Sequence, residues 1–190
     1  MKTLVLLGSP RKGGNTEVLL EWVLRGVAKA GGEVELIRLC ELEIQPCINC
    51  GGCDDTGICI IEDDMTPLYD KILAAQRIIM AAPIYFYGVP AQAKAFVDRT
   101  QSLWSRKKLL KKKGVWVEDP ERKGFLVSVA ATQGKRVFEG AILTMKYTCD
   151  AIGIGYGGEF VVRGIDDLGE MNTAVDELAK AEEAGKNFMK

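Results

Sequence analysis

The hydrophobic pattern of the chain alternates between short continuous runs and helical spacing. Thr3 to Leu7, Arg77 to Ala82 and Phe125 to Ala131 are nearly continuous apolar runs, which is typical of parallel strands buried on both faces. Glu33 to Leu39 mixes charges with apolar residues and predicts an edge strand, and Glu159 to Val162 predicts a last strand. The pattern therefore indicates five strands, with the first three runs at the centre of the sheet.

Apolar residues at helical spacing fill the intervals between these strands. The stripes lie at Val18 to Val23, Leu68 to Ile72, Ala91 to Leu103, Val137 to Ile152 and Met171 to Ala181. Five helices in strict alternation with five strands predict a doubly wound α/β sheet, and five parallel strands favour the flavodoxin-like order over the six-stranded dinucleotide order. We expect a single domain of this kind over residues 1–190, with a cysteine-rich loop at about residues 40–64, after the second strand.

The amino-acid composition limits the classes of protein to which this chain can belong. The 190 residues are 47% hydrophobic and 27% charged, as in globular domains, and the net charge of -1 predicts no nucleic-acid partner. No apolar run is long enough to cross a bilayer and no signal-peptide pattern is present, so we expect no membrane partner and a cytoplasmic location. The chain has no histidine, which excludes imidazole as an acid or base; demanding chemistry therefore requires a cofactor.

Four cysteines crowd into one short segment of the chain. Cys47, Cys50, Cys53 and Cys59 are separated by two, two and five residues. A loop of this kind can wrap several thiolates around one compact centre, and an iron–sulfur cluster fits the spacing. Because no second set of four cysteines exists to hold another cluster, all four would bind the same one.

Three alternatives remain open for this loop. Four thiolates can close a structural zinc site, although zinc loops usually separate two Cys-x-x-Cys pairs by a longer stretch. Disulfides require an oxidising compartment, against which the missing signal peptide argues. Free redox-active thiols are the third alternative. The two cysteines outside the loop, Cys40 and Cys149, are expected to be small buried hydrophobic residues.

The loop after the first strand, Gly8 to Thr16, predicts a phosphate site. It follows a strand and opens a helix, where backbone N–H groups and the helix dipole hold anions. Its candidate binding residues are Ser9, Arg11, Gly13, Asn15 and Thr16. The loop lacks the lysine of a Walker A motif and the full Gly-x-Gly-x-x-Gly fingerprint, which favours a monophosphate over ATP or a dinucleotide. A capped polar turn with nothing bound is the alternative.

The loops after the third and fourth strands reach the same edge of the sheet, where ligands bind in this fold. The first loop places three aromatic residues where a planar ring can lie, and its candidates are Pro83, Ile84, Tyr85, Phe86, Tyr87 and Gly88. The second offers hydrogen bonds to a ring edge or a sugar chain from Thr132, Gln133 and Gly134. Aromatic residues here can stack on a flavin, or they can simply cover the end of the sheet.

Three segments together resemble a known family: Gly8 to Thr16, Pro83 to Arg99 and Thr132 to Gly134. They are similar to the NADPH-dependent FMN reductase branch of the flavodoxin-like flavoproteins, and the cysteine run narrows the resemblance to the iron–sulfur flavoproteins of archaea and anaerobes. The resemblance extends from Met1 to about Val162. It implies one FMN and one [4Fe-4S] cluster per chain, a homodimer or homotetramer, and the cluster ligands Cys47, Cys50, Cys53 and Cys59.

The function that this implies is electron transfer. Electrons from a ferredoxin-type donor would pass through the cluster to FMN and on to a small-molecule acceptor, with the cluster near its own flavin or near that of a neighbouring chain. Two other functions stay open. One is an NAD(P)H-dependent FMN or quinone reductase with zinc or no metal in the cysteine loop, and the other is a non-enzymatic redox sensor or interaction module.

A basic run and the residues near it are the remaining candidates for a functional role. Arg106 to Lys113 carries six positive charges within eight residues, which favours a solvated charged segment over a docking site for an acidic donor. Trp104 and Trp116 flank this run and are expected either at a subunit interface or over the core. An ordinary exposed ion-pair cluster is expected from Lys94, Asp98 and Arg99.

Overall fold

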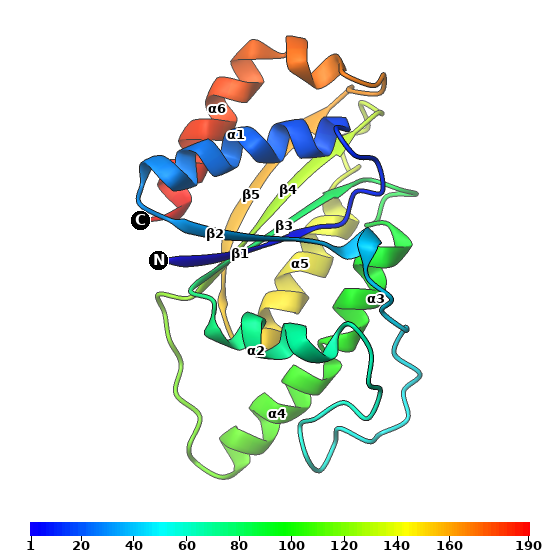
Figure 1. Ribbon diagram of the computed structural model, residues 1–190, viewed down its shortest axis with the longest axis vertical. Coiled ribbons are helices and arrows are strands. Elements are labelled where there is room, and N and C mark those ends of the chain that lie inside the picture. The colour runs from blue at the N-terminus through cyan, green and yellow to red at the C-terminus, as the bar shows by residue number, and fades with distance from the viewer.

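A five-stranded parallel sheet forms the centre of the computed structural model, which describes residues 1–190 (Figure 1). The strands are β1 (Lys2–Leu7), β2 (Glu33–Arg38), β3 (Arg77–Pro83), β4 (Lys123–Ala130) and β5 (Gly155–Arg163). Their order is β2-β1-β3-β4-β5, and every neighbouring pair is parallel. This order confirms the predicted doubly wound, flavodoxin-like fold.

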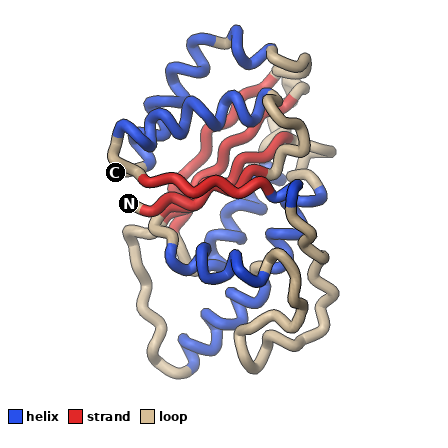
Figure 2. Tube along the Cα trace, viewed as in Figure 1, coloured by secondary structure: helices blue, strands red, loops and turns tan.

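Helices cover both faces of the sheet (Figure 2). They are α1 (Asn15–Lys29), α2 (Thr66–Ala74), α3 (Ala91–Arg99), α4 (Gln101–Lys112), α5 (Glu139–Ile152) and α6 (Val175–Phe188), with short 3-10 helices η1 (Leu39–Glu41) and η2 (Glu170–Thr173). α1 and α6 lie on one face, and α2, α3, α4 and α5 lie on the other (Figure 1). None of these helices combines the length and the apolar character needed to span a membrane.

Alternation of side chains along the central strands builds two cores. Leu4 and Leu6 of β1 pack on the side of α2, α3 and α5, whereas Val5 and Leu7 pack on the side of α1 and α6. Successive side chains of a strand point to opposite faces, so a strand covered on both faces must be apolar throughout. β2 lies at the edge of the sheet and is largely exposed, which explains its mixed composition.

The stripe from Ala91 to Leu103 forms two helices instead of the single one predicted. α3 ends at Arg99 and α4 begins at Gln101. Thr100 lies between them, and its hydroxyl donates a hydrogen bond of 2.6 Å to the carbonyl of Val97, a contact that tends to bend helices. α4 then continues to Lys112, so most of the basic run is helical.

The last stripe is also divided. Met171 is buried in η2, whereas Val175 begins α6 and is exposed. Ala174, between them, has a ψ of 58°, which lies outside the helical region. The apolar spacing therefore continues across a break in the backbone that spacing alone does not reveal.

Candidate functional site

The loops after β1, β3, β4 and β5 line one cavity of about 150 Å³ at the carboxyl edge of the sheet. Seven of the residues selected from the sequence line it: Ser9, Arg11, Asn15, Thr16, Pro83, Ile84 and Tyr85. Five further residues complete the lining: Gly14, Val129, Ala131, Ile165 and Asp166. The fold thus brings the expected phosphate loop and the first part of the aromatic loop to a single place.

The start of α1 gives this cavity the features of an anion site. Gly14 is the N-cap residue and has no side chain to accept hydrogen bonds from the first-turn N–H groups. Such unsatisfied N–H groups and the helix dipole together favour a bound anion. Arg11 lines the cavity as an exposed cation, and Ser9 is buried beside it. These groups fit a phosphate.

Asn15 and Gly13 hold the shape of the phosphate loop. The Asn15 side chain donates to the carbonyl of Asp167 at 2.8 Å and accepts from the N–H of Met171 at 3.1 Å, which ties α1 to the segment after β5. The N–H of Gly13 donates to the Glu17 carboxylate at 2.8 Å, and Gly13 has a φ of +65°, a conformation that suits glycine. Gly13 does not line the cavity.

A carboxylate next to the anion site is neutralised by an ion pair. Glu17 is buried in the first turn of α1 and accepts hydrogen bonds from the Arg38 guanidinium at the end of β2. These bonds lower the pKa of Glu17 and raise that of Arg38. Glu17 is therefore ionised at neutral pH but its charge is compensated, which leaves Arg11 as the cation that faces the cavity.

The aromatic loop ends in a tight turn. Tyr85 and Gly88 exchange two backbone hydrogen bonds of 2.9 and 3.0 Å, and the two residues between them have positive φ angles, +50° for Phe86 and +64° for Tyr87. Two residues with positive φ are the mark of a type I′ turn, which normally uses Asn or Gly. The backbone of Tyr87 packs so closely on α5 that a Cβ on Gly140 would lie 2.3 Å from its carbonyl oxygen.

The rest of the candidate flavin residues lie outside the cavity. They are Phe86, Tyr87, Gly88, Thr132, Gln133 and Gly134. The Tyr87 hydroxyl oxygen approaches Gly134, at 3.0 Å from where a Cβ would stand, so the two loops meet. These residues form a rim beside the cavity, and Phe86 at its tip is fully exposed.

The four loop cysteines line a second, smaller cavity. Cys47 and Cys50 are exposed, Cys53 and Cys59 are half-buried, and all are free thiols. Arg99 and the first residues of α4 line the same cavity. Four thiols of one loop around one cavity are the donor set that an iron–sulfur cluster requires. No three His, Cys, Asp or Glu side chains converge closely enough to hold a single metal ion.

The cysteine loop is seated on α4. Gly57 has a φ of +70°, and a Cβ there would lie 2.7 Å from the Cα of Arg106. The Cys53 sulfur lies 3.6 Å from the Ser105 hydroxyl, and that hydroxyl donates to the Asp54 carboxylate at 3.4 Å. The loop therefore rests directly on the helix that carries the basic run.

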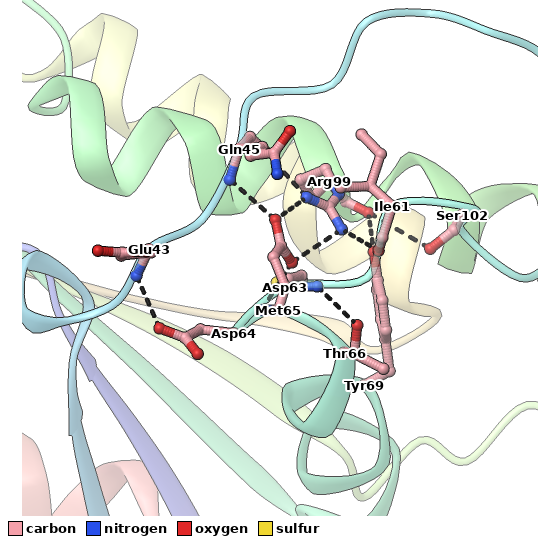
Figure 3. Close-up of polar contacts among 10 residues, drawn as sticks. All are labelled: Glu43, Gln45, Ile61, Asp63, Asp64, Met65, Thr66, Tyr69, Arg99 and Ser102. Carbon is pink, nitrogen blue, oxygen red and sulfur yellow. Dashed lines mark hydrogen bonds and ion pairs between the residues drawn. The ribbon is translucent and has the colours of Figure 1, made fainter.

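Hydrogen bonds close the base of the loop (Figure 3). The N–H of Glu43 donates to Asp64 at 2.8 Å, and the N–H of Gln45 donates to Asp63 at 2.9 Å. Burial alone would raise the pKa of Asp63, but hydrogen bonds from Arg99 and from backbone N–H groups lower it below its ordinary value. Asp63 is thus a charged group that joins the two ends of the loop.

The expected exposed ion-pair cluster is only partly correct. Lys94 and Asp98 do form an exposed pair at 2.7 Å. Arg99 instead is fully buried and pairs with Asp63 at 2.6 Å. It was grouped with Lys94 and Asp98 because all three follow the aromatic loop on the same helix, but Arg99 pairs with a residue of the sequence-distant cysteine loop.

The other two cysteines differ from each other. Cys149 is buried on α5, as expected, and burial raises its pKa to about 12. Cys40 in η1 is half-buried instead of buried, although burial still raises its pKa. Neither lines the cavity of the four loop cysteines.

The basic run is partly paired and partly free. Lys107 is buried and pairs with Asp150 at 3.0 Å, and Lys111 pairs with Glu118 at 3.5 Å. Lys108 lies over the ring of Trp104, 5.3 Å from its centroid. The exposed part of α4 therefore keeps a net positive charge next to the cysteine loop.

Sequence reasoning missed residues of the first cavity and the ion pair beside the second. Ile165 and Asp166 follow β5, whose carboxyl end reaches the same edge as β1, β3 and β4, so the topology could have identified them. Asp63 and Arg99 are separated by 36 residues, and no spacing in the sequence connects them.

The first 152 residues match the model of the family described as NADPH-dependent FMN reductase. The chain belongs to this family. An iron-sulfur flavoprotein of Methanosarcina thermophila is 41% identical over 113 residues, which are 60% of this chain and 59% of that protein. Iron-sulfur flavoprotein MJ1083 of Methanocaldococcus jannaschii is 42% identical over 103 residues, 54% of this chain and 53% of that protein. The resemblance to iron–sulfur flavoproteins is thus confirmed.

These matches span less than two thirds of the length of either relative. A putative NAD(P)H-dependent FMN-containing oxidoreductase of Bacillus subtilis, YwqN, is 34% identical over 106 residues, 56% of this chain and 54% of that protein. An NAD(P)H:quinone oxidoreductase from Methanothermobacter marburgensis superposes with a TM-score of 0.71 at 16% identity, covering 100% of this chain and 98% of that one. At this identity the superposition shows the fold alone.

Proposed function

We propose that this protein is a redox flavoprotein with FMN at the carboxyl edge of the sheet and a [4Fe-4S] cluster in the cysteine loop. When bound, these groups would supply the redox chemistry for electron transfer from a ferredoxin-type donor to a small-molecule acceptor. The observation that carries the proposal is that four thiols of one loop line a single cavity in a chain of an FMN reductase family.

The chain's own groups at the carboxyl edge would bind the phosphate of FMN. Arg11 and the first-turn N–H groups of α1 supply positive charge and donors, with Ser9 and Thr16 beside them. The cavity of about 150 Å³ is smaller than sites for whole small molecules, which measure roughly 300–1,000 Å³. It therefore suits the phosphate end of the ligand. Tyr85 and the rim residues, Phe86, Tyr87, Gly88, Thr132, Gln133 and Gly134, would then contact the remainder.

In the cysteine loop, the proposed cluster ligands are Cys47, Cys50, Cys53 and Cys59. The exposure of Cys47 and Cys50 leaves this side of the cavity accessible to a protein donor. α4 presents positive charge directly beside the loop, since Gly57 packs on Arg106. Such a patch would steer an acidic protein toward the cysteine cavity, with an association rate that falls as salt rises.

Iron, acid-labile sulfide and FMN content, measured on protein purified without oxygen, test this proposal. We expect about four irons, about four sulfides and one FMN per chain. Cys59→Ser should lose most of the iron and keep FMN, and Cys40→Ser, outside the loop, should keep both. Equal iron in the two variants, or FMN without any iron in the wild type after reconstitution, would contradict the cluster assignment.

A second candidate is an NAD(P)H-dependent FMN or quinone reductase. The similarity to YwqN favours it, because that relative is described as NAD(P)H-dependent and FMN-containing. Stopped-flow reduction of bound flavin by NADPH separates the two functions. Fast reduction in the iron-free Cys59→Ser variant would support the reductase, whereas reduction that depends on reduced ferredoxin and on the cluster would support electron transfer.

We also propose that the chain assembles into a homodimer or homotetramer. A groove between α3, α4 and α5 is lined by the exposed apolar side chains of Trp104, Leu143 and Tyr147. Burying such a groove against another chain would be favourable. Light scattering should give a mass of two or four chains, and Tyr147→Glu should lower it.

A further inference from the structure

Arg99 is a buried cation beneath an exposed loop. Its side chain is 0% exposed and that of its partner Asp63 is 6% exposed. Arginine is almost never fully buried unless it is paired, and here Arg99 also lines the cavity of the four cysteines.

All four N–H donors at the end of the guanidinium are used (Figure 3). Nη1 donates to the carbonyl of Gln45 at 2.9 Å and to Asp63 Oδ2 at 2.6 Å. Nη2 donates to the carbonyl of Ile61 at 3.0 Å and to Asp63 Oδ1 at 3.1 Å. Gln45 precedes the first cysteine of the loop and Ile61 follows the last one, so a single side chain joins the two ends of the loop.

The fifth donor, Nε–H, is buried and has no acceptor in the chain. Only one other buried side-chain donor shares this property, Nε1 of Trp116, and Trp116 lines a different cavity. Buried N–H groups are almost always paired, so an unpaired one points to an acceptor that is not part of the polypeptide. Arg99 lines the cysteine cavity, so this unpaired donor belongs to a residue beside the place where the four thiols would hold a group.

We propose that Arg99 is a positioning residue for the cluster, an inference that rests on the proposed function. Its terminal nitrogens fix the two ends of the cysteine loop, and its Nε–H donates a hydrogen bond to a sulfur of the cluster or of a ligating cysteine. Hydrogen bonds to these sulfurs stabilise the more negative, reduced form of a cluster and thereby raise its potential. Arg99 therefore makes reduction easier.

The joining of the two loop ends by the terminal nitrogens of Arg99, here called the clamp, can be tested without any cluster. Hydrogen exchange of the iron-free protein reports on the Gln45 N–H, which donates to Asp63. Arg99→Gln should speed its exchange at least tenfold, whereas Asp98→Asn, an exposed position on the same helix, should leave it unchanged. Unchanged exchange in Arg99→Gln would overturn the clamp, whether or not the wild-type protein binds iron.

The Nε–H donor is tested by the cluster potential in a redox titration followed by EPR. Arg99→Lys keeps the charge and removes Nε–H, so its equilibrium constant for reduction should fall about tenfold, which is about 59 mV for one electron. Asp63→Asn keeps Nε–H while loosening the clamp, and its potential should not fall. Iron-loaded Arg99→Lys with a wild-type potential would overturn the donor, as would an equal fall in Asp63→Asn.

If the Arg99 variants fold but retain no iron, pulsed EPR of the wild-type protein tests the hydrogen bond from Nε–H instead. In reduced wild-type protein labelled with ¹⁵N-arginine, the cluster signal should show a coupling to one ¹⁵N nucleus, and its absence would overturn the donor. A wild-type protein that binds no iron at all would instead contradict the proposed function, while the exchange result for the clamp would stand.

Discussion

The turn at Phe86 and Tyr87 stores backbone strain that a single substitution should release. Phe86 has a φ of +50°, and this conformation costs a residue with a Cβ roughly 1–2 kcal/mol. The residue is 105% exposed, so removal of its side chain loses no burial. Glycine pays roughly 0.5–1 kcal/mol of extra entropy on folding. Phe86→Gly should therefore raise the free energy of unfolding by roughly 0 to 1.5 kcal/mol.

Urea and thermal denaturation of protein freed of flavin measure this change without a contribution from ligand binding. Val117→Gly is the matched control, because Val117 is 82% exposed in a loop and has no positive φ. The control should lose roughly 0.5–1 kcal/mol, whereas Phe86→Gly should gain stability and raise Tm by roughly 2–4 °C per kcal/mol. If Phe86→Gly loses as much stability as the control, the strain argument is wrong.

Three other predictions concern charges and thiols. Arg11→Ala should weaken FMN binding at least about tenfold in a fluorescence titration, because it removes a charge-assisted contact to phosphate, whereas riboflavin, which lacks phosphate, should bind equally well to both proteins. In the iron-free protein at pH 8, mass spectrometry should find Cys47 alkylated long before Cys149. The pKa of about 12 for Cys149 leaves roughly one thiolate in 10⁴. Equal alkylation rates of the two cysteines would contradict the burial of Cys149. Glu17→Gln should cost about 2 kcal/mol of stability at pH 7. The hydrogen bond from Arg38 lowers the folded-state pKa of Glu17. The stabilisation by this pair is therefore present above the unfolded pKa of about 4.3 and is lost as pH falls through the folded-state pKa. A stability difference between the variant and the wild type that persists undiminished at pH 2 would refute this assignment.

The sheet could be predicted because strands that are buried on both faces appear in the sequence as continuous apolar runs. Ile78 and Ile79 of β3 face opposite cores, and both must be apolar. The break between α3 and α4 cannot be read from the apolar spacing, because that spacing continues past Thr100 to Leu103. At the break, the Thr100 hydroxyl donates to the carbonyl of Val97. Hydrophobic spacing records which side chains are buried, and it does not record where the backbone bends.

The residues of the two cavities could be predicted from the sequence to different extents. The phosphate loop is contiguous, so Ser9, Arg11 and Thr16 could be chosen together, as could the cysteines of the loop. The ion pair between Asp63 and Arg99 depends on packing between α3 and a loop that is distant in sequence. Local charge spacing instead suggested an exposed position for Arg99. A long-range contact of this kind becomes visible only when the fold has placed the two segments side by side.

One continuous segment connects the two cavities. It begins with Pro83 to Tyr85, which line the cavity at the carboxyl edge, passes through α3 and ends at Arg99, which lines the cysteine cavity. α3 has 9 residues and is therefore about 13 Å long. Ala93 and Phe96 are completely buried, and a Cβ on Gly8 would lie 2.8 Å from that of Ala93, so the helix is held tightly against the phosphate loop. The spacing between the two sites of one chain is thus set by a packed helix, and the long cysteine loop takes its position from the arginine at the end of that helix.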